Sequence, residues 1–256
     1  MKRTAGYFLL NSPMQNAEWY VDWFNSPYYH LLYNHRNYQE ANHFMEMLCS
    51  HLKLRPHARI WDLACGKGRH AISLNKMGYD VTGTDLATNS IEEASKHANS
   101  TLEFEVHDMR EPYRVAYFDA VFNLFTSIGY FSNEADNYLV FGHVAKSLKP
   151  EGEFVVDFFN AQKVRRTYVK EYTEHRDKLD FRIRKRIEDH KIIKRIEFTD
   201  KGKTYFFEES VALLERNDFE DFAKKAGLKV VSEFGNYHLE PFDQQTSDRL
   251  VLVFKK

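Results

Sequence analysis

Cysteine, proline and long apolar runs are all scarce in this chain of 256 residues, which has 2 Cys and 6 Pro. The two cysteines, Cys49 and Cys65, cannot form a disulfide framework, and neither lies in a Cys/His cluster with the spacing of a zinc site. We therefore expect a reducing, cytoplasmic setting. The 12 histidines show none of the spacings typical of metal ligands, so the sequence predicts no metal site.

Segments that could cross a bilayer are also missing from the sequence. No window approaches the roughly 20 apolar residues that a spanning helix needs. The apolar stretch near the start, Tyr7 to Leu10, is too short for a secretory signal. We expect a soluble protein with no membrane partner.

Net charge is nearly absent, because 36 Lys and Arg residues face 37 Asp and Glu residues, for a total of -1. This balance argues against a chain-wide electrostatic attraction to nucleic acid. Locally, however, residues 163–203 contain 15 Lys and Arg against 8 Asp and Glu, an excess of +7 that leaves -8 for the remainder. The positive charge of this segment fits either the solvent-exposed face of a lid or a surface that contacts an anionic substrate or RNA. RNA is the weaker interpretation, because no aromatic residue interleaves with Arg182, Arg184 and Arg186 on their strand face.

From residue 58 onward, the chain contains an alternation of short apolar runs with longer amphipathic ones, which is typical of a mostly parallel sheet with helices. The last two predicted strands have no helix between them, so we expect them to pair antiparallel. The predicted strands are 58–64, 80–85, 102–107, 118–123, 153–159, 229–234 and 249–254, and the predicted helices are 69–77, 88–99, 134–148, which Lys149–Gly152 stops, and 216–226.

Two parts of the chain stand outside this alternation. The first 52 residues are rich in Tyr, Trp and His and predict helices, whereas the runs 181–187, 191–198 and 203–211 predict an antiparallel meander. We therefore expect three parts: a helical cover over 1–57, an α/β core formed by 58–162 and 211–256, and an inserted antiparallel lid over 163–210.

The sharpest motif runs from Asp62 to His70, DLACGKGRH, at the end of the first predicted core strand and the start of the helix after it. Glycines here let the backbone approach a ligand beside the free N–H groups of a helix start. With Ala71, the motif also matches the dinucleotide fingerprint G-x-G-x-x-G/A, and Asp85 ends the next strand near the offset of a ribose-binding acid. Binding of NAD is therefore one interpretation.

Electrostatics separates two cofactors that fit this motif. Asp62, Asp85 and Asp108 all fall at the carboxyl ends of adjacent predicted strands, where an open α/β sheet binds its ligand. Three carboxylates would repel a pyrophosphate. They suit S-adenosylmethionine, which carries a sulfonium and an ammonium and no phosphate.

With these residues, the chain resembles the class I S-adenosylmethionine-dependent methyltransferases. It is most similar to a small soluble branch with the glycine motif D-L-A-C-G-x-G-R-H and a fourth strand that runs into N-L-F-T-S-I-G-Y-F. The resemblance covers residues 58–160 strongly and 214–256 through the closing strand pair. It implies a Rossmann-like sheet of seven strands, mostly parallel with the last antiparallel, N-terminal helices and an inserted antiparallel β meander.

The resemblance implies a role for each residue of the glycine motif. Ala64, Cys65, Gly66 and Gly68 would lie against the methionine part of S-adenosylmethionine. Asp62 would steady the loop or the ammonium. No base is paired with Cys65, which is therefore expected to be a small pocket residue rather than a nucleophile.

Residues after the next two strands are matched to the nucleoside part. Asp85 would accept both ribose hydroxyls, with Leu86 against the adenine. Asp108 would accept a hydrogen bond from the adenine amine, and Met109 would cover the ring. Each has a structural alternative, since Asp85 could cap a helix and Asp108 a turn.

Further contacts to the methionine part are expected from two places. Asn123 and Leu124, at the end of the fourth strand, would offer backbone to the ammonium. In the N-terminal helices, Tyr33 and Arg36 are candidates to bind the carboxylate, for which an Arg fork is well shaped.

The residues after the fourth strand constrain the acceptor. The chain has Asn-Leu-Phe-Thr from Asn123, not the N/D-P-P-Y/F that methyltransferases acting on adenine or glutamine use, and the aromatic run with Phe125, Tyr130 and Phe131 favours a pocket for a small molecule. Tyr130 and His238 are the candidate catalytic bases. The sequence leaves open the methylated atom and the oligomeric state.

Methyl transfer to a small molecule is thus the expected function. The alternatives are an RNA or protein methyltransferase that uses the basic insert, an NAD-dependent oxidoreductase, and a non-catalytic protein that only binds the cofactor.

Overall fold

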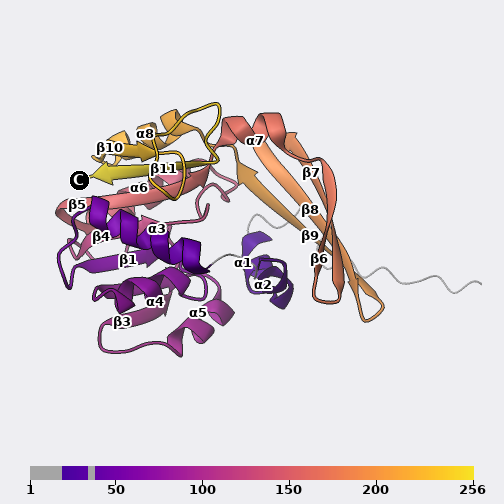
Figure 1. Ribbon diagram of the computed structural model, residues 1–256, viewed down its shortest axis with the longest axis horizontal. Coiled ribbons are helices and arrows are strands. Elements are labelled where there is room, and N and C mark those ends of the chain that lie inside the picture. The colour runs from indigo at the N-terminus through magenta and orange to yellow at the C-terminus, as the bar shows by residue number, and fades with distance from the viewer. Residues whose placement is uncertain (1–18, 34–37) are drawn as a thin grey trace, which may run out of the picture. The chain divides into compact units, whose positions relative to one another are not determined.

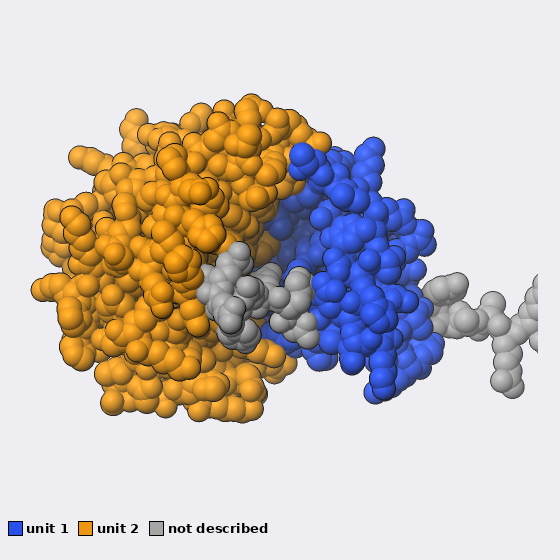
Figure 2. All heavy atoms as spheres, in the orientation of Figure 1, with its two compact units in different colours: residues 1–35, 167–213 blue, residues 36–166, 214–256 orange. Residues whose placement is uncertain are grey.

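The computed structural model of the protein describes residues 19–33 and 38–256. Among these, residues 19–33 and 167–213 form one compact unit, unit 1, and residues 38–166 and 214–256 form another, unit 2. Figure 2 colours the two units separately. Each has a sheet and a hydrophobic core of its own.

Unit 2 is built on a seven-stranded sheet in the order β10-β11-β5-β4-β1-β2-β3 (Figure 1). All neighbours pair in parallel except at β11, which is antiparallel to both β10 and β5. The fold class predicted from the sequence is confirmed, including its antiparallel closing pair. The strands are β1 Arg59–Leu63, β2 Asp80–Asp85, β3 Leu102–Val106, β4 Phe118–Asn123, β5 Leu148–Phe159, β10 Lys229–Phe234 and β11 Arg249–Lys255.

Helices cover both faces of this sheet, because its central strands are apolar on both sides. On one face, buried residues of α3 and α4 join Ile60, Val155 and Val253 in a single core. On the other face, Phe141 of α6 packs against Phe154 and Phe254 of the strands and against α8. The helices of unit 2 are α3 Tyr38–His51, α4 Arg69–Lys76, α5 Thr88–Ser95, α6 Ala135–Ser147, α7 Ala161–Thr167 and α8 Arg216–Lys225.

Two segments of unit 2 differ from the sequence-based expectation. The stretch predicted only to stop a helix after residue 148 already belongs to β5, which begins at Leu148 and pairs there with Phe118 before the register shifts. Helix α7 was not predicted either, because seven residues are too few to show a helical period in the sequence.

The chain leaves unit 2 after α7 and returns just before α8, and these two points are fastened together. Glu215, the N-cap residue of α8, accepts a hydrogen bond from Gln162 Nε2 at 3.1 Å. The other carboxylate oxygen of Glu215 lies 3.6 Å from Arg165 Nε. Glu215 also forms a reciprocal capping box with Asp218, which fixes the start of α8.

Unit 1 contains α1 Trp19–Phe24, α2 Pro27–Tyr33 and a four-stranded antiparallel sheet in the order β6-β7-β8-β9. The strands are β6 Glu171–Arg176, β7 Leu179–Glu188, β8 Lys191–Asp200 and β9 Lys203–Ala212. The predicted meander is confirmed, with β6 as an added strand. The apolar face of this sheet packs against α1 and α2 and forms a hydrophobic core. The buried residues of this core are Trp23, Leu32, Phe181, Ile183, Ile196 and Phe198.

The arginine face of β7 is exposed as predicted, but its charges are matched. Arg182 and Arg184 both contact Glu171, and Arg186 contacts Glu188 and Glu208. Over residues 167–213, 12 Lys and Arg residues face 10 Asp and Glu residues. This excess is smaller than the one counted over residues 163–203 for two reasons. Three basic residues of that segment belong to α7 in unit 2, namely Lys163, Arg165 and Arg166. Two glutamates of β9, Glu208 and Glu209, lie beyond its end but belong to the sheet of unit 1.

No helix in the described part of the chain is both long enough and apolar enough to cross a membrane.

The packing of α6 leads to a first prediction. The Phe141 ring is fully buried against four other phenylalanines. We expect Phe141→Ala to lower the free energy of unfolding by about 3–5 kcal/mol, measured by urea denaturation, because it removes apolar contacts and leaves a cavity. Leu139→Ala on the same helix is the control, since Leu139 is 47% exposed, and it should cost less than about 1 kcal/mol. Equal costs for both variants would contradict this packing.

Candidate functional site

The loop between β1 and α4 turns through left-handed backbone. Ala64 has φ 64°, Gly66 has φ 56° and Gly68 has φ 76°. At Gly68 a Cβ would lie 2.6 Å from the Phe104 ring, and at Gly66 it would meet no atom within 4 Å. The first glycine of the pair therefore leaves open space beside the loop, whereas the second permits close packing.

Asp62, near the end of β1, stabilises this loop through its carboxylate. Its carboxylate is buried and accepts a hydrogen bond from the Ala71 N–H of α4 at 3.0 Å. Burial raises the pKa of Asp62 to about 7, and the nearby charge of Asp85 acts in the same direction, while the Ala71 bond opposes it. Asp62 thus joins β1 to the first turn of α4.

Asp85, at the end of β2, also stabilises the loop through its carboxylate. Its Oδ2 accepts from the Gly66 N–H at 2.8 Å, and its Oδ1 accepts from the Ala87 N–H at 2.8 Å. Burial raises the pKa of Asp85 although these backbone bonds lower it. Each carboxylate oxygen can accept a second hydrogen bond, so Asp85 can still take two hydroxyl groups.

Cys65 lies between these carboxylates and is buried, with its thiol directed at the Gly66 carbonyl at 3.6 Å. Burial raises the pKa of this thiol well above its ordinary value, and the charges of Asp62 and Asp85 raise it further. A thiol kept protonated is a poor nucleophile.

After β3, Asp108 is engaged by a neighbour two residues away. The Arg110 Nε lies 3.0 Å from both carboxylate oxygens of Asp108. Burial acts to raise the pKa of Asp108, but the hydrogen bonds and charge of Arg110 outweigh it, so the pKa is lowered. Met109, between the two, is half-buried. The pairing of Arg110 with this carboxylate is not predicted by the sequence pattern.

At the end of β4, Asn123 is fully buried beside the glycine loop. Its Nδ2 donates to the Leu63 carbonyl at 3.1 Å, which ties β4 to β1. Its Oδ1 has no hydrogen-bond partner in the described part of the chain. Leu124 is also buried. A buried acceptor left open at this place can bind a donor from a ligand.

The two candidate bases lie in different surroundings. Tyr130 is half-buried, and its hydroxyl donates to the Thr126 carbonyl. His238 is exposed, with its ring centroid 5.7 Å from that of His43 on α3. His238 follows Tyr237, whose ring lies 5.3 Å from that of Phe125.

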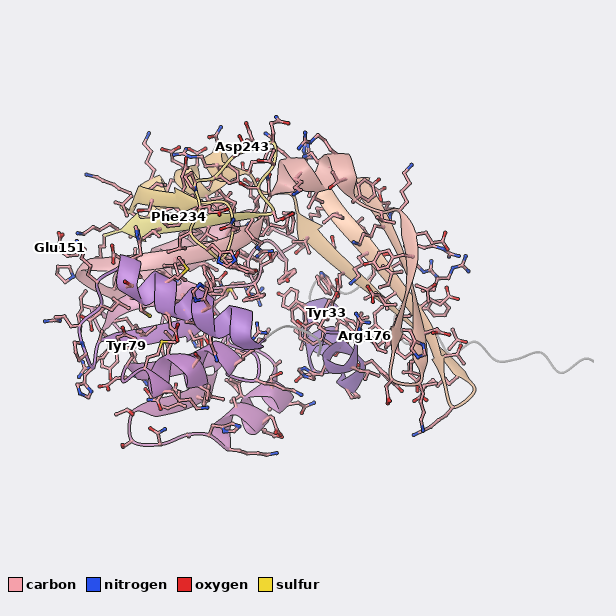
Figure 3. All side chains as sticks on the ribbon, in the orientation of Figure 1. Tyr33, Tyr79, Glu151, Arg176, Phe234 and Asp243 are labelled. Carbon is pink, nitrogen blue, oxygen red and sulfur yellow. The ribbon has the colours of Figure 1, made fainter. Side chains whose placement is uncertain are left out.

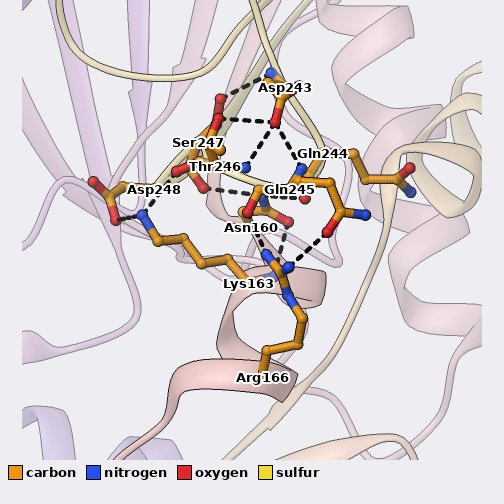
Figure 4. A network of polar contacts seen from close by, with 9 residues as sticks. All are labelled: Asn160, Lys163, Arg166, Asp243, Gln244, Gln245, Thr246, Ser247 and Asp248. Carbon is orange, nitrogen blue, oxygen red and sulfur yellow. Dashed lines mark hydrogen bonds and ion pairs between the residues drawn. The ribbon is translucent and has the colours of Figure 1, made fainter.

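The loop between β10 and β11 that carries His238 is fastened at its far end to α7 (Figure 4). Asn160 Nδ2 donates to the carbonyls of Gln244 and Ser247, and Lys163 Nζ lies 2.7 Å from Asp248 Oδ1. Arg166 donates to the side chain and the carbonyl of Gln245. The loop is therefore tied down on the side of the sheet where β5 ends.

Tyr33 lies in unit 1, where its hydroxyl donates to Glu209 Oε1 at 2.7 Å. The Lys194 ammonium donates to the same hydroxyl, and Arg176, also labelled in Figure 3, reaches the Leu32 carbonyl at 3.4 Å. Arg36 lies outside the described residues. The role of Tyr33 and Arg36 at a methionine carboxylate stays a prediction.

Asp157 of β5 and Arg249 of β11 were not predicted from the sequence. They form an ion pair with Nε and Oδ1 2.7 Å apart, in which Asp157 is fully buried and Arg249 is half-buried. Asp157 also accepts from the Phe125 N–H at 2.8 Å. A signal was present in the sequence, because each is a charged residue in or beside an apolar strand. Since β11 runs antiparallel, its first residue lies where β5 ends.

The raised pKa of Asp62 gives a pH prediction. Between the ordinary pKa of 3.8 and about 7, folded Asp62 keeps a proton that the unfolded chain has released. The wild type therefore loses stability as the pH rises through this window. Asp62→Asn does not titrate, so we expect the free energy of unfolding of this variant to gain about 2–3 kcal/mol on that of the wild type between pH 5 and pH 8.

Asp119→Asn is the control for this measurement. Burial raises the pKa of Asp119, but Lys149 and the Arg59 N–H outweigh it and lower the pKa. Both its folded and unfolded values then lie below pH 5, so its difference from the wild type should stay constant between pH 5 and pH 8. A constant difference for Asp62→Asn as well would show that Asp62 is ionised in the folded protein over this whole range.

Known proteins resemble this chain in sequence and in structure. A family model of a methyltransferase domain matches residues 60–152. The putative methyltransferase YqeM of Bacillus subtilis is 32% identical over 139 residues, which make up 53% of this chain and 54% of that protein. The chain thus spans about half the length of the curated relatives it matches.

Among solved structures, an S-adenosylmethionine-dependent methyltransferase from Clostridium acetobutylicum superposes with a TM-score of 0.75, at 19% identity, over 89% of this chain and 95% of that one. The sugar N-methyltransferase KedS8 from Streptoalloteichus has a TM-score of 0.66, at 18% identity, over 85% of this chain and 88% of that one. At these identities the likeness shows the fold. Residues 60–152 therefore match a methyltransferase domain, and the chain has the Rossmann-like fold of S-adenosylmethionine-dependent methyltransferases.

Proposed function

We propose that the protein is an S-adenosylmethionine-dependent methyltransferase that acts on a small-molecule acceptor. The observation that carries the proposal is Asp85, a half-buried residue whose carboxylate accepts from the Gly66 and Ala87 amides and keeps acceptor capacity for the two hydroxyls of a ribose.

The residues around Asp85 fit this cofactor in two further respects. Open space beside Gly66 leaves room for a ligand against the loop backbone. The Oδ1 of Asn123, which has no hydrogen-bond partner among the described residues, can accept from an ammonium. We therefore propose that the methionine part lies along Ala64, Cys65, Gly66 and Gly68, with Asp62 bracing the loop and Asn123 and Leu124 beside the ammonium.

The nucleoside part would lie beyond Asp85. We propose Leu86 and Met109 as the apolar contacts of the adenine. Asp108 is proposed to accept from the adenine amine, a role in which the amine competes with the Arg110 guanidinium that now holds this carboxylate.

Methyl transfer mainly requires that the acceptor atom, the methyl group and the leaving sulfur be held in line. S-adenosylmethionine, when bound, supplies a sulfonium-linked methyl group that an acceptor attacks in line, leaving S-adenosylhomocysteine. Tyr130 donates to the Thr126 carbonyl and so shapes the loop after β4. His238 is exposed and can pass a proton to water, which suits an amine acceptor. Both residues stay candidates for the catalytic base.

A small amine is the first acceptor class to test. Support comes from the fold shared with a sugar N-methyltransferase and from the contact between two aromatic rings, Phe125 after β4 and Tyr237 after β10. The RNA alternative loses its main support, because the arginines of β7 are paired with glutamates. A pyrophosphate, as in NAD, would lie near the carboxyl groups of Asp62, which is buried, and Asp85, which is half-buried, and this disfavours the oxidoreductase alternative.

Asp85→Asn tests the cofactor. The amide nitrogen that replaces one carboxylate oxygen cannot accept from a hydroxyl, so we expect S-adenosylhomocysteine binding, measured by calorimetry, to weaken about 100-fold. Asp80→Asn is the matched control, because Asp80 begins the strand that Asp85 ends, and it should bind as the wild type does. Binding of NADH with no binding of S-adenosylhomocysteine would reverse the assignment.

Transfer itself is tested with methyl-labelled S-adenosylmethionine and a cell extract separated into small molecules, RNA and protein. We expect label in the small-molecule fraction with the wild type and far less with Asp85→Asn at the same concentration of S-adenosylmethionine, because the variant binds the cofactor more weakly. Label in RNA or protein would point to the macromolecular alternatives. Tight cofactor binding without label in any fraction would leave a non-catalytic binding protein.

A further inference from the structure

The backbone after β4 is strained at two successive residues. Phe125 has φ 60° and Thr126 has φ 63°, so both lie in the left-handed region. Side chains with a Cβ avoid this region, and a β-branched residue such as threonine avoids it most strongly. The strained pair follows Asn123 and Leu124 directly, at the end of the strand beside the glycine loop. Strain of this kind persists only where surrounding contacts enforce it.

Asp157 of β5 supplies the contacts that enforce it. Its Oδ2 accepts from the Phe125 N–H at 2.8 Å, and its backbone carbonyl accepts from the Thr126 N–H at 2.9 Å. Asp157 is fully buried. One residue of a central strand thus binds both strained amides, with its side chain on one and its main chain on the other.

Arg249, the first residue of β11, completes the arrangement from the opposite side. Its Nε donates to Asp157 Oδ1 at 2.7 Å, and its Nη2 donates to Thr126 Oγ1 at 3.1 Å. The planar guanidinium can make both bonds at once because its donors are held in a fixed fork. Arg249 thus binds the strained residue through its hydroxyl group, and a glycine at position 126 would have no side chain for this hydrogen bond.

The strained backbone fixes the place of the Phe125 ring. The ring stacks on His70 of α4, with centroids 5.0 Å apart and planes at 20°, and it lies 5.3 Å from the Tyr237 ring. Tyr237 in turn reaches Asp157 Oδ2 at 3.3 Å. Asp157 therefore organises the backbone after β4 and one of the rings packed on it, and Phe125 joins that loop to the helix that follows the glycine motif.

We infer that Asp157 and Arg249 are positioning residues for methyl transfer: they hold the Phe125–Thr126 backbone in its left-handed form and so fix the acceptor side of the site beside Asn123. This inference rests on the proposed methyl transfer. It separates the cofactor from the acceptor, since neither residue bonds directly to the glycine loop within the described part of the chain. Loss of the fork should therefore lower the rate of transfer and leave cofactor binding intact.

Arg249→Lys is the principal test, because lysine keeps the charge opposite Asp157 but cannot bond Asp157 and Thr126 in a fork. We expect amide hydrogen exchange at Phe125 and Thr126 to become at least about tenfold faster. The dissociation constant of S-adenosylhomocysteine should change less than about twofold. The rate of label transfer into the small-molecule fraction at saturating S-adenosylmethionine should fall at least about tenfold, with little change in the apparent KM for S-adenosylmethionine.

Thr126→Val is the second variant, and it keeps the β-branched shape while removing only the hydroxyl that Arg249 binds. It should show the same pattern with a smaller change in exchange. Lys149→Met is the matched control, because Lys149 pairs with Asp119 at the opposite end of β4 and β5. In this control the Phe125 and Thr126 amides and the transfer rate should match the wild type.

The outcomes separate this inference from the proposed function. Wild-type rate and wild-type exchange in both Arg249→Lys and Thr126→Val would overturn it, as would loss of S-adenosylhomocysteine binding in folded Thr126→Val. Faster exchange with an unchanged transfer rate would reduce the pair to a structural support and also overturn it. A wild-type protein that binds S-adenosylhomocysteine but transfers no label would instead contradict the proposed methyl transfer, and the inference would fall with it.

Discussion

A carboxylate can be buried only if the surrounding groups compensate its lost hydration, and the candidate site is arranged around this constraint. Asp62 and Asp85 are both turned into the protein, and both meet it with backbone N–H groups of the glycine loop and its neighbours. The shape of the loop follows from those bonds. Asn123 lies beside this loop for a separate reason, because its side chain ties β4 to the last residue of β1.

The parts of the fold that the sequence predicts best are those with local signals. The bounds of β2, β4 and β10 agree with the predicted ranges, since each is an apolar or alternating run with turn residues at its ends. The glycine loop is predicted for the same reason: Gly66 and Gly68 adopt the left-handed backbone that glycine tolerates best.

Contacts between residues far apart in sequence escape such reasoning. Asp157 and Arg249 are separated by 92 positions, and their partners, Phe125 and Thr126, adopt a conformation that their residue types disfavour. Strand β6 escapes for another reason, because its sequence, EYTEHR, has one aromatic residue among polar and charged ones and lacks an apolar face. The basic excess of residues 163–203 depends on where the counted segment begins and ends, since three basic residues at its start belong to α7 and two glutamates of β9 lie just beyond its end.

Glu215 brings together the two ends of the segment inserted between α7 and α8. By bonding Gln162 and lying beside Arg165, it brings the point where the chain leaves unit 2 next to the point where it returns. A segment whose two ends are fastened together on its host can be lengthened, shortened or exchanged without disturbing the host sheet. The β6–β9 meander is therefore attached as a replaceable segment, and a sheet of this design can change what it carries there while its seven strands stay as they are.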